Sequence, residues 1–256
     1  MFQISLFDLM PDLEGDKLPP KSKQMNVLIA CEESQRVCIA FREKGHNAFS
    51  CDIQECSGGH PEWHVQGDVL SVLNPQKQSI PGDEWYGFKF RTMDGTLHCL
   101  DGKWDLIIAH PPCTYLSNAG AARLYPEAGK LNMARYKKGL KAKEFFMCFY
   151  NADCPRIAIE NPIPTRIFDL PPYTQVVEPY EHGHPYSKAT CLWLKGLPRI
   201  YPTNIVTDNI ISWVSGGSKD NHGNPRKQSG TKFRDSKTKS KTFEGIAKAM
   251  AEQWGG

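Results

Sequence analysis

Cys113 stands out among the residues that could do chemistry because of the residues before it. His110, Pro111 and Pro112 interrupt the apolar run at 106–109 and lead directly into Cys113. A thiolate is a strong nucleophile, and a turn stiffened by two prolines can present one at the end of a strand. A packed thiol is the alternative, since free cysteine is among the most buried residue types. The pattern around Cys113 alone is compatible with both.

A carboxylate and an amide follow another apolar run further along the chain. Glu160 ends the predicted strand at 156–160, and Asn161 follows it directly. Because the carboxyl ends of parallel strands meet at one edge of a sheet, we expect Glu160 on the same edge as Cys113. A carboxyl group in that position can act as a general acid or base. The same residues, followed by Pro162, could also form a turn that ends the strand.

Two further acids suit a nucleotide ligand. Asp52 ends the predicted second strand, where α/β folds hold the hydroxyl groups of a ribose. Asp68 lies in the third predicted element, at 64–70, and can accept a hydrogen bond from an adenine amino group. The first turn contains Glu32 and Glu33 in place of a glycine-rich pattern, so it would repel a pyrophosphate and tolerate an ammonium group. We therefore expect an adenosine-containing ligand without a pyrophosphate.

Strands and helices that alternate along the chain must position these residues. Apolar runs predict strands at 26–30, 47–53, 64–70, 104–109 and 156–160, and apolar residues at helical spacing predict helices at 34–44, 131–151 and 242–254. Gly45 is placed to end the first helix. Leu140, Phe145, Phe146 and Phe149 supply the apolar bulk of the second. The closely spaced runs 174–180 and 189–194 predict an antiparallel pair. The pattern predicts a doubly wound, mostly parallel α/β sheet with an antiparallel edge.

Less regular segments separate these elements. Residues 71–103 are expected to form an irregular insertion with a hairpin at 87–100, residues 110–130 a long loop, and residues 161–172 a segment too rich in proline for regular structure. Residues 1–24 are expected to be a flexible tail. The remaining residues, 25–256, are expected to form one domain, with a basic loop at about 215–241.

Two motifs resemble those of a known enzyme family. The pattern DxIIxxPPC at 105–113 and the pattern IxIENP at 157–162 resemble motifs of the DNA cytosine-5 methyltransferases. The longer runs QGDVL, HPPCTYLSNAG, SKATCLWLKGLP and SKTFEGIAKAMAEQWG look more like the short cytosine methyltransferase-like proteins of phages and prophages. The resemblance spans about 26–254. It implies a Rossmann-like methyltransferase fold, S-adenosylmethionine as the cofactor, and methyl transfer to carbon 5 of cytosine in DNA.

The resemblance also assigns roles to individual residues. Cys113 would add to carbon 6 of cytosine, and Glu160, with a raised pKa, would protonate or hydrogen-bond N3. Asn161 would fix the loop, and Lys188, which stands where the family has an arginine, would contact the carbonyl oxygen of the base. The expected cofactor-binding residues are Ala30, Cys31, Glu32, Ser34, Asp52, Ile53, Asp68, Val69, His110 and Pro111.

The chain also departs from the family pattern. The sequence CEESQR replaces the Phe-Gly-Gly loop that binds the cofactor, and only 45 positions separate Leu197 from Thr242, too few for a large target-recognition domain. Three hypotheses follow. The protein could be a compact DNA methyltransferase, an enzyme that performs the same chemistry on a free cytidine nucleotide, or a catalytically silent protein that binds S-adenosylmethionine or nucleic acid.

Charge is concentrated near the carboxyl end of the chain. Residues 219–241 contain eight Lys or Arg and two Asp, a balance of +6, whereas the whole chain carries +3 and the remainder therefore −3. A basic segment of this kind is typical of a loop that contacts phosphates, and equally of a solvated loop. In the DNA methyltransferase hypothesis, this segment and the loop at 114–130 would hold the DNA backbone.

The tail contains a short apolar cluster. Gln3, Ile4, Ser5, Leu6 and Phe7 resemble the pentapeptide that binds the bacterial sliding clamp. A tail that packs on its own domain is the alternative. No apolar run approaches the length needed to span a bilayer and no signal-peptide pattern is present, so the sequence predicts a cytoplasmic protein without a membrane partner. A monomer is expected.

The nine cysteines are predicted to be reduced because their spacing is not that of a disulfide framework. Cys51, Cys56, His60 and His64 have roughly the ligand types of a zinc site. We do not predict a metal, because Cys51 ends a strand and no paired C-x2-C knuckle is present.

Overall fold

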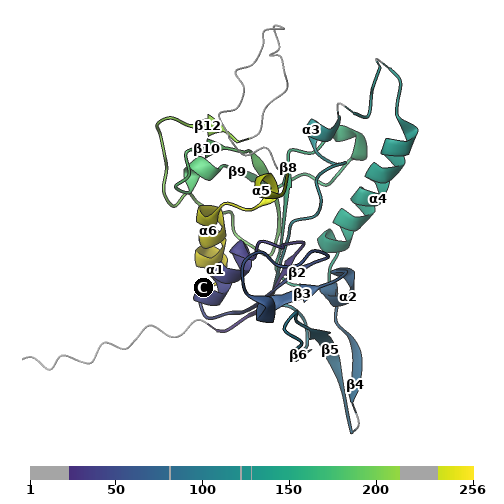
Figure 1. The fold of residues 1–256 in the computed structure, drawn as a ribbon, viewed down its shortest axis with the longest axis vertical. Helices are drawn as coiled ribbons and strands as arrows, with labels where there is room; N and C mark the ends of the chain where they lie inside the picture. The colour runs from purple at the N-terminus through teal and green to yellow at the C-terminus, as the bar shows by residue number, and fades with distance from the viewer. Residues whose placement is uncertain (1–22, 81, 122, 128, 214–235) are drawn as a thin grey trace, which may run out of the picture.

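The structure is a computed structural model that describes residues 23–80, 82–121, 123–127, 129–213 and 236–256. Its centre is a seven-stranded sheet in the order β3-β2-β1-β7-β8-β11-β9 (Figure 1). The strands are β1 (Asn26–Ala30), β2 (Asn47–Asp52), β3 (His64–Gln66), β7 (Leu106–Ala109), β8 (Ile157–Pro162), β9 (Gln175–Val177) and β11 (Thr190–Lys195). The first five pair in parallel, and β11 runs antiparallel to both β8 and β9. The predicted α/β sheet with an antiparallel edge is confirmed.

Helices cover both faces of the sheet (Figure 1). Alternate residues of β1 enter different cores, because side chains of a strand point to opposite faces in turn. Val27 and Ile29 pack in the core that contains α1 (Arg36–Glu43) and α6 (Glu244–Trp254), and Leu28 packs in the core that contains Phe146 of α4 (Met133–Tyr150). Burial on both faces explains why β1 reads as an uninterrupted apolar run.

The helix ends also follow from local sequence. Gly45 has a φ of +85° just after α1, as expected for a residue that ends a helix. Asn132 begins α4 because its side chain accepts a hydrogen bond from the Arg135 amide at 3.0 Å. The prediction for Leu140 is wrong, since its side chain is exposed. Phe146 and Phe149 supply the buried surface instead.

The insertion is more regular than predicted. The strands β4 (Gln76–Ile80), β5 (Asp83–Arg91) and β6 (Leu97–Asp101) form an antiparallel sheet, of which the β5–β6 hairpin was predicted and β4 was not. The sequence of β4 is polar because this edge strand is largely exposed, so it lacks an apolar pattern. Phe88 and Phe90 anchor the small sheet against Trp104 of the main core.

The remaining elements are short. They are α2 (Leu70–Leu73), α3 (Asn118–Ala121), α5 (Ser236–Ser240), three 3-10 turns (Pro61–Trp63, Arg166–Phe168 and Pro179–Glu181) and the parallel pair of β10 (Tyr186–Ser187) and β12 (Ile211–Ser212). The proline-rich segment therefore holds one regular turn, and β8 extends two residues beyond its predicted end, to Pro162. Among the described residues, no helix is both long and apolar enough to cross a membrane.

We expect Gly139→Ala to destabilise the protein. Gly139 lies in the middle of α4, and a methyl group on it would collide with the ring of Phe168. Overpacking typically costs ~1–3 kcal/mol, which outweighs the roughly 1 kcal/mol that alanine gains over glycine in a helix. Urea unfolding should therefore show a lower free energy of unfolding than the wild type, and Lys141→Ala on the exposed face serves as the control. Equal or greater stability of Gly139→Ala would contradict this packing.

Candidate functional site

The loop after β7 holds Cys113 at the carboxyl edge of the sheet. The Leu116 and Ser117 amides donate to the Cys113 carbonyl at 3.2 and 3.0 Å, which closes a turn around the half-buried thiol. Asn161, at the end of β8, donates its side-chain amide to the Pro111 carbonyl at 2.9 Å. Asn161 is only 1% exposed, so this buried contact holds the loop.

Glu160 and His110 form a buried pair beside this loop. His110 Nδ1 lies 3.1 Å from Glu160 Oε2, and the two side chains are only 10% and 14% exposed. Burial alone would raise the pKa of Glu160, but the hydrogen bond with His110 and the charge of Lys188 outweigh it and hold the pKa below its ordinary value. The prediction of a raised pKa for Glu160 is therefore wrong, because sequence reading did not pair it with His110 and Lys188.

Lys188 lies close enough to influence the thiol as well. Burial raises the pKa of the Cys113 thiol, and the negative charge of Glu160 raises it further, whereas the Lys188 ammonium lowers it. The Lys188 backbone amide donates to Glu178 Oε2 at 2.7 Å, and Glu178 belongs to a capping box with Glu181. These contacts position the segment before β11, and they bring Lys188 to the site from far along the chain. Cys113, Glu160, Asn161 and Lys188 therefore converge.

The switch point of the sheet lies next to this cluster. Strand order reverses between β1 and β7, and ligands of doubly wound sheets bind outside the carboxyl ends of strands at such a point. Cys31 follows β1 there with a φ of +59°, a strained value for a residue other than glycine. Burial raises the pKa of Cys31, and the charges of Asp52 and Asp68 raise it too, so both predicted carboxylates lie near this turn.

Asp52 and Asp68 each close a local turn. Asp52 Oδ1 accepts from the Gln54 amide at 2.9 Å, and Asp68 Oδ1 accepts from the Leu70 amide at 3.0 Å. The Gly67 amide donates to the Asp52 carbonyl at 2.9 Å, which joins the two turns. The other oxygen of each carboxylate, Oδ2, accepts no hydrogen bond from the described residues. The pair can therefore still accept from a ligand.

Glu32 has a structural task that the sequence did not indicate. Its two carboxylate oxygens accept from the Val37 and Cys38 amides at 2.8 and 3.2 Å, so it satisfies the amino end of α1. Burial raises the pKa of Glu32, although the charge of His110 and these two hydrogen bonds oppose that effect. Glu32 is only 4% exposed, so any contact with a cofactor would be added to its role in holding α1.

The other predicted cofactor residues differ in what they can offer. Ile53 is 77% exposed, so its side chain is available to a ligand. Ala30, Ser34, Val69 and Pro111 are buried, so Ala30 and Val69 in particular serve the core. His110 offers its second ring nitrogen, Nε2, which is buried and has no hydrogen-bond partner among the described residues.

Two further residues support the site and were not predicted. Gln35, fully buried with a φ of +58°, donates to the His60 carbonyl at 2.8 Å and holds the loop after β2. Arg135 donates to the carbonyls of Thr114 and Gly120 at 2.9 and 3.2 Å and so ties the Cys113 loop to α4. The sequence signal for Gln35 is the glycine at position 58, because a side chain at that position would collide with Gln35.

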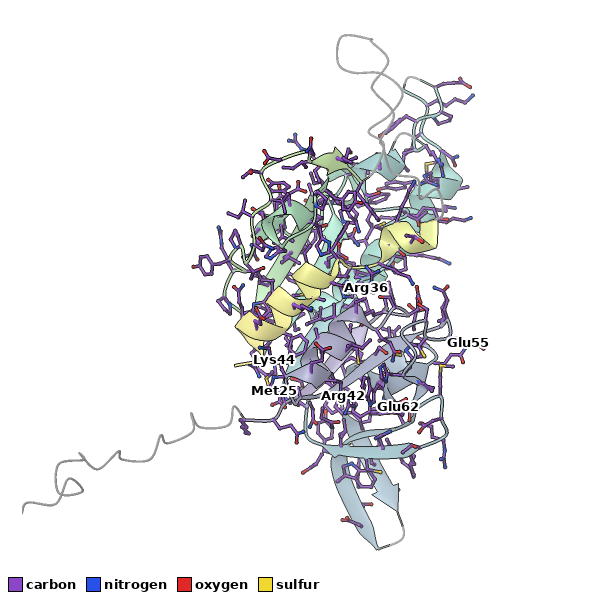
Figure 2. All side chains as sticks on the ribbon, turned by 60° about the vertical axis from the view of Figure 1, so that its left-hand side comes forward. Met25, Arg36, Arg42, Lys44, Glu55 and Glu62 are labelled. Carbon is purple, nitrogen blue, oxygen red and sulfur yellow. The ribbon has the colours of Figure 1, made fainter. Side chains whose placement is uncertain are left out.

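The carboxyl-terminal segment returns to the turn after β1. Lys241 Nζ lies 3.0 Å from Ser57 Oγ and 3.9 Å from a Glu33 carboxylate oxygen. Arg36 of α1, whose side chain is labelled in Figure 2, donates to the Thr242 carbonyl at 2.7 Å. The end of the predicted basic segment therefore lies beside the predicted cofactor turn. Residues 214–235 of that segment lie outside the described residues, as do Gln3, Ile4, Ser5, Leu6 and Phe7.

The nine cysteines are free thiols. In the described ranges, no group of three His, Cys, Asp or Glu side chains is placed to hold a metal ion. The residues of the zinc pattern have other partners: His64 contacts Ser50 and the Gln54 carbonyl through its two ring nitrogens, and His60 stacks on Trp63 at 3.8 Å.

No protein-family model matches the chain, and none of the curated proteins matches it either.

Proposed function

We propose that this protein transfers a methyl group from S-adenosylmethionine to carbon 5 of cytosine in DNA. At the ends of β7 and β8, the thiol of Cys113, the buried carboxylate of Glu160 and the ammonium group of Lys188 converge. This convergence is the observation that carries the proposal. The doubly wound sheet with an antiparallel edge supports it, because the resemblance implies this architecture.

The residues at the switch point fit this cofactor. S-adenosylmethionine supplies an electrophilic methyl group on a positively charged sulfur. Asp52 would hold the ribose hydroxyls and Asp68 the adenine amino group, as acceptors beside an acidic turn that tolerates a cation. His110 Nε2, an unpartnered buried atom within the described structure, is available to a polar group of the ligand.

The chain's own residues would carry the covalent step. Carbon 5 of cytosine is a weak nucleophile, so Cys113 first loses its proton and its sulfur bonds to carbon 6, which pushes an electron pair toward carbon 5. Carbon 5 would use that pair to bond the methyl carbon, whose bond to the cofactor's sulfur would break and leave its electron pair on that sulfur as a neutral thioether. A base then removes the proton from carbon 5, the electron pair reforms the double bond, and the sulfur leaves as thiolate.

Glu160, His110 and Lys188 would stabilise the charge that develops on the ring. Because the Glu160 pKa is lowered, Glu160 is ionised at rest, and the proton for N3 would come through it from His110 at 3.1 Å. Lys188 would contact the carbonyl oxygen of the base. A lysine does so less rigidly than an arginine, because it has no planar fork of donors.

Two groups of residues would contact the DNA backbone. One is the predicted loop at 114–130, which with α4 borders a hollow of about 330 Å³ that contains Arg123, Arg135 and Lys138. The other is the basic segment at 219–241, of which residues 236–241 are described. Lysine and arginine side chains on both segments can neutralise phosphates, and the target base would be flipped out of the duplex into the site.

The free cytidine nucleotide and the silent binding protein are the competing hypotheses. Tritiated S-adenosylmethionine should label duplex DNA when incubated with the full-length protein, and dCMP should be labelled far more slowly. Labelling of dCMP alone would favour the nucleotide enzyme. If neither duplex DNA nor dCMP is labelled but calorimetry shows that the protein binds S-adenosylmethionine, the silent binding protein is favoured.

We also propose that the tail binds a bacterial sliding clamp through Gln3 to Phe7. Leu6→Ala combined with Phe7→Ala should reduce capture of the protein on immobilised clamp by at least about tenfold, because each side chain buries apolar surface in a groove. Leu13→Ala combined with Leu18→Ala, in the same tail, is the matched control. Unchanged capture by the Leu6 and Phe7 variant would exclude this peptide as the contact.

A further inference from the structure

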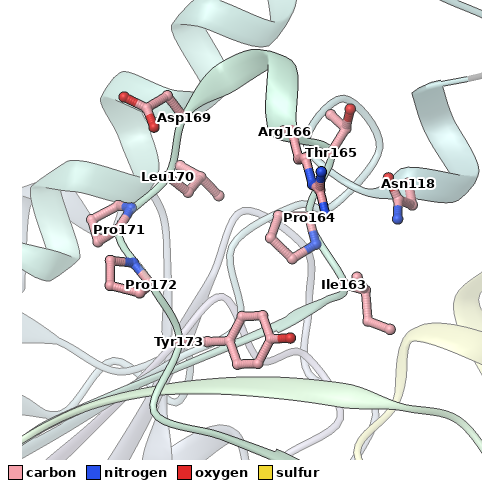
Figure 3. A pocket seen from close by; sticks show the side chains of 10 residues that line it. All are labelled: Asn118, Ile163, Pro164, Thr165, Arg166, Asp169, Leu170, Pro171, Pro172 and Tyr173. Carbon is pink, nitrogen blue, oxygen red and sulfur yellow. The ribbon is translucent and has the colours of Figure 1, made fainter.

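A pocket of about 790 Å³ opens beside the proposed active site (Figure 3). The segment after β8 forms most of its wall. Tyr173, Leu170 and three prolines give it an apolar surface, and Arg166 and Asn118 add polar groups (Figure 3). The lining residues are Asn118, Ile163, Pro164, Thr165, Arg166, Asp169, Leu170, Pro171, Pro172 and Tyr173.

Hydrogen bonds join this pocket to the Cys113 loop. The Asn118 amide donates to the Ile163 carbonyl at 2.9 Å, and the Thr165 amide donates to the Leu116 carbonyl at 2.8 Å. Ile163 is three residues beyond Glu160, and extended chain covers at most about 10 Å over three residues. Bases of one DNA strand rise about 3.4 Å each, so the pocket lies within a few nucleotides of a cytosine held at Cys113.

The lining suits a nucleotide. Tyr173 is 43% exposed and Ile163 41% exposed, although both are large apolar side chains at a concave surface. A nucleobase can stack on an aromatic ring or lie against proline rings. Arg166 and Asn118 have no side-chain partner among the described residues, so a guanidinium and an amide remain available for a phosphate or a base edge.

The structure holds this wall in one shape. Phe168, only 1% exposed, stacks on Tyr136 of α4 and anchors the turn that carries Arg166. Trp193 donates to the Pro171 carbonyl at 2.6 Å, and Lys143 donates to the Asp169 carbonyl at 2.8 Å. Asp169 has a φ of +46°, a left-handed conformation that aspartate adopts more readily than most residues, and it closes the turn after Phe168. A wall fixed at both ends is preorganised for binding.

We propose that this pocket receives an unstacked nucleotide that flanks the target cytosine in the same DNA strand. The proposal rests on the proposed function and extends it. The base stacks on Tyr173 against the proline wall, and Arg166 binds the adjacent phosphate. The pocket thus supplies an additional contact with the DNA strand in a chain that has no room for a large target-recognition domain.

A double-mutant cycle between protein and DNA tests this contact. The full-length protein is titrated into fluorescein-labelled duplexes that contain one cytosine, with one flanking base at a time, up to three on either side, replaced by an abasic site. At one position we expect the abasic site to weaken binding about five- to hundredfold, the range of base–aromatic stacking. In Tyr173→Ala the same abasic site should cost little, because the ring is already gone.

Matched variants control for changes in overall charge and surface. Arg166→Gln should lower the salt dependence of binding, whereas Arg199→Gln, an exposed arginine elsewhere, serves as its control. Tyr201→Ala is the control for Tyr173→Ala, since Tyr201 is 70% exposed and lies away from the pocket. The two control variants, Arg199→Gln and Tyr201→Ala, should keep the wild-type penalty for the abasic site.

Equal abasic penalties in the wild type and Tyr173→Ala, or no penalty at any flanking position, would overturn the proposal. These binding measurements need no methyl transfer, so they separate the two proposals. If Tyr173 and the flanking base show no coupling but methyl transfer is observed, only the proposal for the pocket is excluded. If the coupling is observed without methyl transfer, only the proposed chemistry is excluded.

Discussion

Replacing Cys113 by serine should abolish methyl transfer to DNA and leave DNA binding intact. The hydroxyl of serine has a pKa far above that of a thiol and is a much poorer nucleophile toward carbon 6 of cytosine. We expect the rate to fall by at least about 10³-fold, since covalent catalysis is lost entirely. The side chains are close in size and Cys113 is only half-buried, so the fold should tolerate the change.

Trapping with a modified base makes this test specific. In DNA that contains 5-fluorocytosine, no proton can leave carbon 5 after methyl transfer, so the wild type should remain covalently attached and migrate slowly in a denaturing gel. Cys113→Ser should form no such adduct. Cys99→Ser, which removes an exposed thiol on β6, is the control and should form it normally. An adduct with Cys113→Ser, or the absence of an adduct with both the wild type and Cys99→Ser, would contradict the assignment of the nucleophile.

Glu160→Gln should have opposite effects on transfer and on thiol reactivity. Transfer should fall about 10²- to 10⁴-fold, because glutamine cannot pass a proton to N3. The Cys113 thiol should instead become more reactive. Burial and the charge of Glu160 raise its pKa, and removal of that charge lowers it, so more thiolate exists at a given pH.

Alkylation by iodoacetamide, followed by mass spectrometry of the peptide that contains Cys113, measures this effect. In the wild type, the rate should rise with pH throughout the range from 7 to 9, because the raised pKa keeps the thiol largely protonated there. In Glu160→Gln the rate at pH 8 should be higher than in the wild type, because the lower pKa leaves more thiolate at that pH. Lys188→Met should slow alkylation, since the ammonium group favours the thiolate. Equal rates in all three proteins would show that these charges do not reach the sulfur.

The sequence by itself determined the sheet and the edge where the site lies. Buried parallel strands are apolar on both faces, so β1, β7 and β8 could be read directly as short apolar runs. The residue after each run must then lie at the carboxyl edge of the sheet, which places Cys113 and Glu160 on one side without any structural information. Gly45 could be predicted as a helix end because its φ requires a residue without a side chain.

Only the tertiary structure decided what these side chains contact. His110 and Glu160 are 50 residues apart in sequence, yet their contact reverses the expected direction of the Glu160 pKa. Glu32 caps α1, and Arg135 holds the Cys113 loop, through hydrogen bonds that no local pattern specifies. The polar strand β4 could not be read either, because its pairing with β5 stabilises it.

The physical reason is a difference in range. Strand and helix patterns reflect burial along a few consecutive residues, so they are written in the local sequence. The pKa of a side chain, its hydrogen-bond partners and the walls of a pocket depend on groups that folding brings within a few ångströms from distant segments. The pocket beside Tyr173 is one such case, since α3 and the segment after β8 form it together.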